Sequence, residues 1–233
     1  MPHKEKERNL IYSGRLPLPD LKNIKIIQII GPSGAGKTTL ISTLKDNYDL
    51  CEGRVQTPIR YTTRQVRFNE LHSENKHLDH SEFKNKIDTG EINIYWNRQL
   101  TENQIDFFGF SIPKNINNQI FVLSGNNGIT KGINISHQEI RTDNILTIGV
   151  FADSEVRRQR IIERSPDIYK NLPKEFSKRV QDPTIIVDHC HFLIKNSSCT
   201  KSDFTNTFLT IIKSILTDQE VPHTMGLHQT EGE

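Results

Sequence analysis

An apolar run followed directly by a glycine-rich turn constrains this chain more than any other feature. The run is Ile26–Ile30 (IIQII), and the turn is Gly31–Thr38 (GPSGAGKT). The turn matches G-x-x-x-x-G-K-[ST] in full, and the residues around it predict the strand and the helix that this pattern requires. The stretch is therefore expected to form a loop that cradles phosphate groups at the N-terminus of a helix.

Each residue type in the Gly31–Thr38 loop suits that chemistry. Glycines allow left-handed dihedral angles and close backbone approach, so that N–H groups can point at phosphate oxygens. Lys37 supplies charge for the β- and γ-phosphates, and the Thr38 hydroxyl is the expected Mg²⁺ ligand. We therefore predict a site for ATP and Mg²⁺. Its nucleotide-binding residues are Gly31, Ser33, Gly34, Ala35, Gly36, Lys37, Thr38 and Thr39.

Length and charge exclude several classes of protein. The 233 residues suit one domain with an insertion, and 30 Lys and Arg residues against 28 Asp and Glu residues leave little net charge. This balance argues against a nucleic-acid or membrane-surface partner. Three cysteines without metal spacing, no apolar run of membrane-spanning length and a charged N-terminus favour a reduced, cytoplasmic setting.

Apolar strands alternate with helices along the chain, which predicts a three-layer α/β fold with a parallel sheet. Strands are expected at Ile24–Ile30, Val55–Tyr61, Gln119–Leu123, Ile145–Phe151 and His191–Lys195, and helices at Thr38–Asn47, Ser81–Ile87, Ser154–Arg164, Lys174–Val180 and Thr200–Leu216. The main domain is expected at 23–216, between a polar leader (1–22), in which one edge contact is possible, and a polar tail (217–233). Residues 62–118 differ in composition and are interpreted as an insertion.

The phosphate loop alone does not separate kinases from GTPases or motor ATPases. The chain lacks the base-reading N-K-x-D segment of GTPases, and the strand expected before Ser124 does not end in the Asp that motor ATPases carry. It offers instead three arginines, Arg60, Arg64 and Arg67, within eight residues. These suit a second phosphorylated molecule, although a solvated basic loop is the alternative.

From Ile24 to Leu216 the sequence resembles the guanylate-kinase-like P-loop kinases, and most closely their ribose 1,5-bisphosphate phosphokinase branch. Thr63-Arg64 and Arg67 match the T-R-x-x-R element that faces the acceptor phosphate, and Arg60 stands where the bisphosphokinases tend to have Arg. The order F…G…W…Y-G of the bisphosphokinase insertion is matched by Phe83, Gly90, Trp96 and Phe108-Gly109.

The later segments carry the resemblance further. Ser124-Gly125 resembles the N-G-S segment of the bisphosphokinases, and Arg158–Arg164 resembles the helix R-Q-R-L-x-x-R-G that enters a lid, expected here at 164–178. Arg179 falls on a later lid-side arginine, and Asn196 on the step near the adenine. The resemblance thus implies a P-loop kinase fold with an acceptor-binding insertion and a lid. It assigns catalysis to Lys37, Arg160 and Arg164, nucleotide binding also to Arg160, Arg164 and Asn196, and acceptor binding to Arg60, Arg64, Arg67, Phe108, Ser124 and Arg179.

Departures from guanylate kinases bear on the acceptor. Ile94 occupies the position of the Glu that reads guanine, and Phe108 and Phe110 replace hydrogen-bonding residues for GMP. A site built to hydrogen-bond its ligand loses several kcal/mol when such partners vanish. The chain also departs from the bisphosphokinases, with Phe110 in place of a small aliphatic residue and Ser165-Pro166 after the lid arginine.

The implied reaction transfers a phosphoryl group from ATP to ribose 1,5-bisphosphate, giving phosphoribosyl pyrophosphate and ADP. Two alternatives stay open: a guanylate kinase, and a weakly active binding module of the guanylate-kinase type. Such modules typically lose the loop lysine, whereas Lys37 is present here. The partners implied are ATP and a phosphorylated small molecule, and the sequence does not indicate an oligomeric state.

Overall fold

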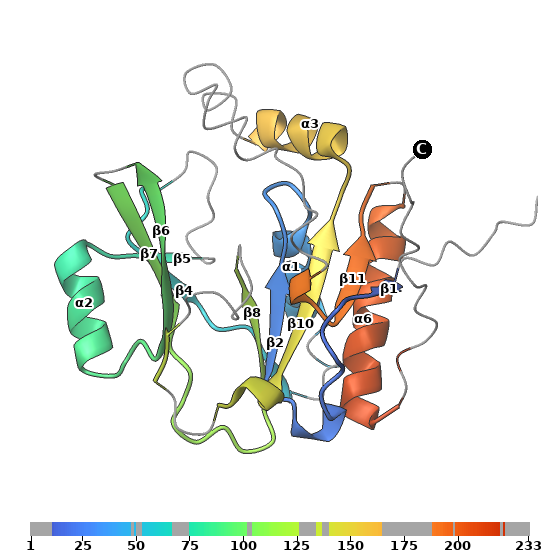
Figure 1. The fold of residues 1–233 in the computed structure, drawn as a ribbon, viewed down its shortest axis with the longest axis horizontal. Helices are drawn as coiled ribbons and strands as arrows, with labels where there is room; N and C mark the ends of the chain where they lie inside the picture. Colours follow the sequence, from blue (N-terminus) through green and yellow to red (C-terminus); the bar gives the residue numbers. More distant parts are fainter. Residues whose placement is uncertain are drawn as a thin grey trace, which may run out of the picture.

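Two β-sheets lie side by side in this chain (Figure 1). The structure is a computed structural model, and it describes residues 11–47, 49, 53–66, 75–101, 104–125, 134–136, 140–164, 188–197, 199–219 and 221. The first sheet has six strands in the order β1-β11-β10-β2-β8-β3, and the second has five in the order β5-β4-β7-β6-β9. The expected helix at Lys174–Val180 lies outside the described residues, as does nearly all of the expected lid.

The first sheet is parallel from β3 to β11, which confirms the predicted α/β class. Its strands are β1 (Ile11–Ser13), β2 (Ile26–Ile30), β3 (Val55–Gln56), β8 (Ile120–Ser124), β10 (Ile145–Phe151) and β11 (Phe192–Lys195). Strand β1 is the exception, because it pairs antiparallel with β11 at the edge. It lies within the stretch interpreted as a polar leader, where one edge contact was considered possible.

Every residue of β2 is buried, as its continuous apolar sequence predicts for a strand covered on both faces. Because side chains alternate across a strand, Ile27 and Ile29 face one side of the sheet and Ile26 faces the other. The first side packs against α1 (Lys37–Asp46) and α6 (Lys201–Thr217). The phosphate loop therefore begins at the end of a strand in the middle of the core.

Helix α6 is fixed by its cap and by its apolar face. Thr200 and Asp203 form a reciprocal capping box at its start, which satisfies two backbone N–H groups. The residues that it buries against the first sheet are Phe204, Phe208, Ile211, Ile212 and Ile215. Burying one such side chain stabilises a fold by roughly 1.5–3 kcal/mol, so this face accounts for the attachment of the helix.

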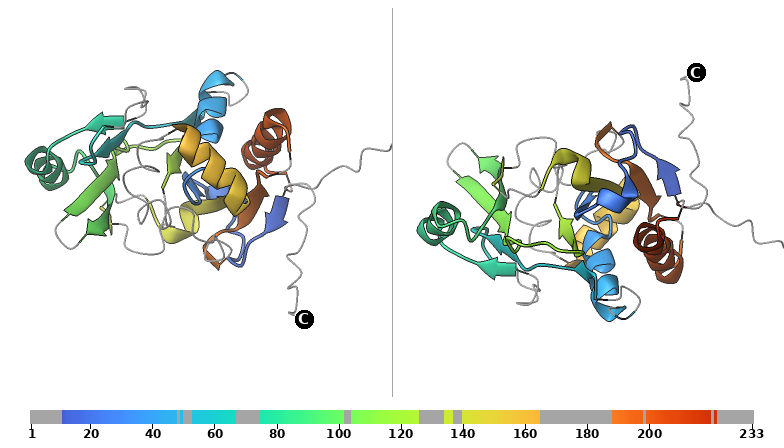
Figure 2. Two further views of the ribbon diagram at one scale, coloured as in Figure 1. Left: turned by 90° about the horizontal axis from the view of Figure 1, so that it is seen from above. Right: turned by 90° about the horizontal axis from the view of Figure 1, so that it is seen from below.

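The second sheet is formed largely by a hairpin of β6 (Ile94–Thr101) and β7 (Gln104–Phe110). Strands β4 (Arg60–Thr62), β5 (Asn75–His77) and β9 (Asn134–Ile135) complete it. Helix α2 (His80–Asp88) covers its outer face, where Leu78, Phe83 and Ile92 form a small core (Figure 2). A capping box of Asp79 and Glu82 begins this helix, close to its predicted start.

The inner face of the second sheet packs against the first sheet. Ile94 and Phe110 meet Ile26, Phe121 and Leu123, which lie on the face of the first sheet opposite α1 and α6. The order of layers is therefore helices, first sheet, second sheet and α2 (Figures 1 and 2). This packing turns one face of the second sheet towards the strands that carry the phosphate loop.

The single strand predicted at Val55–Tyr61 is wrong. The structure divides this stretch into β3, in the first sheet, and β4, in the second. Pro58 lies between them, and a proline cannot donate to a sheet ladder. The chain therefore crosses from one sheet to the other at this point and brings Arg60 beside the core strand β8.

Candidate functional site

Three glycines give the loop between β2 and α1 its shape. Gly31, Gly34 and Gly36 have φ angles of 149°, 80° and 111°, which L side chains rarely adopt. A Cβ at Gly31 would lie 2.2 Å from the carbonyl oxygen of Val150 on the neighbouring strand. The loop thus depends on glycine for both conformation and space, as its sequence pattern predicts.

Lys37 begins α1, and its ammonium group lies back against the loop. Nζ donates to the carbonyl oxygens of Gly31 at 2.6 Å and Pro32 at 2.9 Å. Thr38 follows it in the first turn of the same helix. The lysine charge, the helix N-terminus and the left-handed glycines suit the phosphate groups of a nucleotide.

Asn196 lies immediately after β11 and contacts the backbone of the phosphate loop. Its Nδ2 donates a 2.8 Å hydrogen bond to the carbonyl oxygen of Ala35. A Cβ at Gly36 would lie 2.4 Å from the same nitrogen, so the two residues fit only because position 36 has no side chain. Asn196, expected near an adenine, thus has its amide nitrogen bonded to the loop backbone.

Helix α3 (Ser154–Arg164) packs one of its turns against the loop. Arg160 Nη1 donates to the Gly34 carbonyl oxygen at 3.2 Å. Arg157 is fully buried, with Nε donating to the Ala152 carbonyl oxygen at 2.9 Å, whereas Arg158 is half-exposed and lies 3.8 Å from Glu155. Arg157 is therefore a core residue, and Arg160 contacts the phosphate loop.

The remaining predicted arginines divide into three groups. Arg164 is the last residue of α3 and is exposed there. Arg67 and Arg179 lie outside the described residues. Arg60 lies on β4, close to the phosphate loop, and Arg64 lies just beyond that strand.

Arg60 borders a pocket that also reaches the start of α1. The pocket is lined by Thr38, Ile41, Lys45, Pro58, Ile59, Arg60, Phe110, Val122 and Ser124. Arg60 Nε donates to Asn75 Oδ1 at 2.7 Å, and Nη1 donates to the Ser124 carbonyl oxygen at 3.4 Å. The structure thus brings the predicted Mg²⁺ ligand Thr38 together with two predicted acceptor residues.

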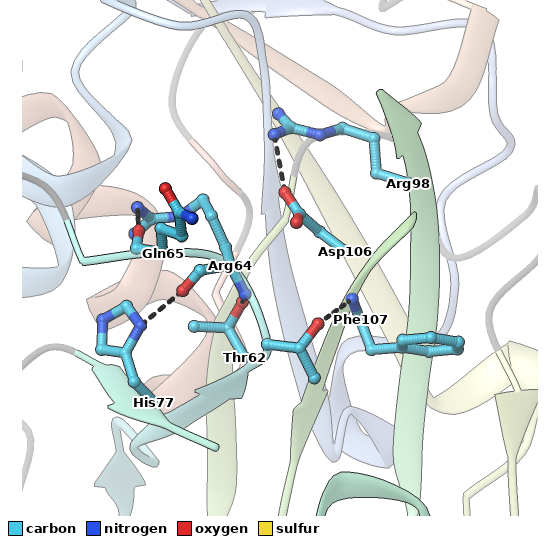
Figure 3. A network of polar contacts seen from close by, with 8 residues as sticks. Thr62, Arg64, Gln65, His77, Arg98, Asp106 and Phe107 are labelled. Carbon is cyan, nitrogen blue, oxygen red and sulfur yellow. Dashed lines mark hydrogen bonds and ion pairs between the residues drawn. The ribbon is translucent and has the colours of Figure 1, made fainter. Parts of the chain in front are cut away.

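Arg64 is buried, and its contacts with Gln65 and His77 are shown in Figure 3. Its Nη1 donates to the Gln65 carbonyl oxygen at 2.6 Å, and its own carbonyl oxygen accepts a 2.7 Å hydrogen bond from His77 Nδ1. The Arg64 guanidinium thus bonds within its own segment, and Arg64 is not among the residues that line the pocket beside Arg60.

Phe108 lies on the inner face of the second sheet, where Trp96 stacks against it with ring centroids 5.6 Å apart. Two guanidinium groups approach the same ring, those of Arg60 and Arg98. Arg98 also pairs with Asp106, and neither residue was predicted from the sequence. The local sequence carries no signal for this pair, because the pair depends on the strand register that sets Arg98 opposite Asp106 and Trp96 opposite Phe108.

The family model described as ABC transporter matches residues 19–132. Among solved structures, a crystal structure of guanylate kinase from Anaplasma phagocytophilum has a TM-score of 0.49 and 14% sequence identity, covering 88% of this chain and 87% of that chain. A search of curated proteins finds no match.

The strand β2, the glycine loop and the helix α1, with β2 set in a parallel sheet, make this a P-loop nucleotide-binding fold. Within the described part of the chain, no group of three or more His, Cys, Asp or Glu side chains could hold a metal ion. None of the described helices is long and apolar enough to cross a membrane.

Proposed function

We propose that this chain is an ATP-dependent phosphotransferase whose acceptor is a phosphorylated small molecule. The observation that carries the proposal is the pocket between the two sheets, because one pocket is lined by Thr38 at the phosphate loop and by Arg60 and Ser124. A donor nucleotide on the loop and an anionic acceptor beside Arg60 would meet there. Transfer between two bound ligands depends on such proximity.

The residues of the loop have defined tasks in this proposal. Lys37 and the loop N–H groups bind the β- and γ-phosphates, and Thr38 with the phosphate oxygens would hold Mg²⁺. The metal ion supplies charge neutralisation and orients the phosphate chain. Arg160, already bonded to Gly34, and Arg164 neutralise the negative charge that spreads over the transferred group.

Arg60 binds the acceptor through its existing phosphate group. A guanidinium is well suited to this task because it is always charged and has a planar set of donors. The oxygen that attacks the γ-phosphorus would belong to a phosphate group of the acceptor, which is already ionised. No side chain then needs to remove a proton.

Ribose 1,5-bisphosphate is the acceptor that we favour, with phosphoribosyl pyrophosphate and ADP as products. Ile94, Phe108 and Phe110 are all buried apolar residues, and none can hydrogen-bond a guanine base. GMP phosphorylation is therefore the weaker alternative. The binding-module alternative is disfavoured because Lys37 is present and lies in the loop.

Simple ATP hydrolysis is disfavoured by the end of strand β8. This strand is the immediate neighbour of β2, and it ends at Ser124, whose carbonyl oxygen accepts a hydrogen bond from Arg60. Motor ATPases place a carboxylate at the corresponding end. The position here contributes to an acceptor pocket and supplies no acidic side chain.

The test is ADP formation from ATP and Mg²⁺ with a panel of acceptors: ribose 1,5-bisphosphate, ribose 5-phosphate, GMP, dGMP and no acceptor. We expect turnover that depends on a phosphorylated sugar and exceeds the rate without acceptor. Efficient use of GMP with an inert sugar bisphosphate would replace this proposal by the guanylate kinase alternative. If the rate of ADP formation is the same without an acceptor as with each acceptor in the panel, the protein is an ATPase and the kinase proposal fails.

A further inference from the structure

The inner face of the second sheet carries a charged pair that the proposed reaction does not use. Arg98 on β6 lies directly opposite Asp106 on β7, and Arg98 Nη2 is 3.3 Å from Asp106 Oδ2 (Figure 3). The two side chains differ in accessibility: that of Asp106 is 4% exposed and that of Arg98 is 27% exposed. The cation is thus the member of the pair that a ligand can reach.

Arg98 and Arg60 both pack against the ring of Phe108. The guanidinium carbons of Arg60 and Arg98 each lie 5.7 Å from the centroid of the Phe108 ring. The two charges therefore cannot be farther apart than twice that distance, and the ring lies near both of them. Cations packed on an aromatic face keep their charge while losing freedom of movement.

We propose that Arg98 forms a second anion subsite, which binds the acceptor's non-reacting anionic group while Arg60 binds the reacting end. This inference rests on the proposed function, because it assumes that an acceptor is bound beside Arg60. It names the class of acceptor: a small molecule with two anionic groups, such as a sugar bisphosphate. Asp106 is the positioning residue, because its buried carboxylate pairs with the Arg98 guanidinium and holds it in place.

The charges on this face favour an anion over a neutral or cationic group. Two guanidinium groups contact Phe108, against the one buried carboxylate of Asp106. A hydrogen bond from a guanidinium to a phosphate or carboxylate is stronger than one between neutral groups. Discrimination between acceptors with one and two anionic groups should therefore depend on Arg98.

Binding measurements test this without requiring turnover. The dissociation constants of ribose 1,5-bisphosphate and ribose 5-phosphate are measured by calorimetry for wild type and Arg98→Gln, with the half-exposed Arg158→Gln as the matched control. We expect Arg98→Gln to weaken the bisphosphate by about tenfold or more and the monophosphate by less than about twofold. Arg158→Gln should leave the ratio of the two constants unchanged.

A second variant guards against misfolding. Arg98→Gln leaves the Asp106 carboxylate buried without its cation, so the double variant Arg98→Gln/Asp106→Asn removes both charges and should melt near the wild-type temperature. The double variant should show the same loss of preference for the bisphosphate over the monophosphate. Arg98→Lys should restore part of that preference.

Several results would overturn the subsite. These are an unchanged ratio in Arg98→Gln and in the double variant, equal weakening of both ligands, or a wild type that does not bind the bisphosphate. The proposed function fails separately: a wild type that binds the bisphosphate with Arg98-dependent preference, yet transfers no phosphoryl group to it, refutes the kinase and keeps the subsite. A wild type that transfers a phosphoryl group to the bisphosphate, but whose preference for the bisphosphate does not depend on Arg98, keeps the kinase and refutes the subsite.

Discussion

The amide of Asn196, at the end of β11, donates a 2.8 Å hydrogen bond to the carbonyl oxygen of Ala35, which lies 161 residues earlier in the phosphate loop. The bond is buried, and it joins the loop to the strand beside β10. The shape of the loop is therefore set partly by the packing of the first sheet and not by its own glycines alone.

Asn196→Ala should weaken nucleotide binding because it leaves the Ala35 carbonyl oxygen without this donor. An unsatisfied buried acceptor costs about 1–3 kcal/mol, part of which should appear as lower stability and part as a higher Kd for ATP. Calorimetric titration with ATP and a melting curve measure the two parts. Unchanged ATP affinity would show that the loop holds its shape without Asn196.

Lys37→Ala should abolish phosphoryl transfer and leave the fold intact. Nζ donates to the carbonyl oxygens of Gly31 and Pro32 in the loop, where its charge suits phosphate groups and contributes little to packing. The expected loss of transition-state stabilisation exceeds about 3 kcal/mol. Steady-state kinetics and the melting temperature are the measurements, and near-normal turnover by the folded variant would contradict the mechanism.

Arg60→Ala should raise the KM for the acceptor more than the KM for ATP. Arg60 lines the pocket on the side of the second sheet, and its loss from a partly dry site should cost on the order of 2–4 kcal/mol. Arg160→Ala should instead damage ATP use, because Arg160 contacts Gly34. Arg158→Ala is the control and should be nearly silent.

The acceptor-binding role predicted for Arg64 from the sequence differs from the contact that its side chain makes in the structure. The T-R-x-x-R element assigns Arg64 to the acceptor phosphate, whereas its guanidinium bonds to the Gln65 carbonyl oxygen. If Arg64 contributes to the acceptor site, Arg64→Ala should raise the acceptor KM as Arg60→Ala does. A loss of melting temperature with unchanged acceptor KM would make Arg64 a structural residue.

Acidification should destabilise the fold through His191. Burial lowers the pKa of His191, and its Nδ1 accepts a 2.8 Å hydrogen bond from the Thr147 N–H, which requires that nitrogen to be unprotonated. The unfolded chain binds the proton more readily, so stability is present above the usual pKa of about 6.5 and is lost as the pH falls below it. Melting curves above and below that pH measure the loss.

His191→Gln provides the comparison, because its side-chain carbonyl oxygen can accept from the same N–H and does not titrate. On acidification, the melting temperature of the wild type should fall further than that of this variant. An equal loss in both proteins would show that other groups control the acid response.

The sequence predicted the first sheet well because its strands are short, continuous apolar runs. Strands β2, β8 and β10 lie within two residues of their predicted bounds, since burial on both faces leaves a signal that does not depend on register. Helix α6 lies within one residue of its predicted bounds, Thr200–Leu216. The glycine loop was predicted in full because its pattern is local.

The second sheet was not predicted, because its hairpin strands mix polar and apolar residues on both faces. Trp96 and Arg98 point to the inner face and Tyr95 to the outer one, where it packs near α2, so the hairpin shows no alternation of polar and apolar residues. The partners of Arg98 and Asn196 depend on strand register and on contacts distant in sequence. Local patterns do not contain that information.

Phosphoryl transfer to the acceptor is measured directly by ³¹P nuclear magnetic resonance of the reaction mixture. Wild type is incubated with ATP, Mg²⁺ and ribose 1,5-bisphosphate, with Lys37→Ala as the inactive control. We predict ADP together with a new signal split by phosphorus–phosphorus coupling, because the transferred group joins a phosphate oxygen of the acceptor. Release of inorganic phosphate alone, or a new signal without that coupling, would contradict it.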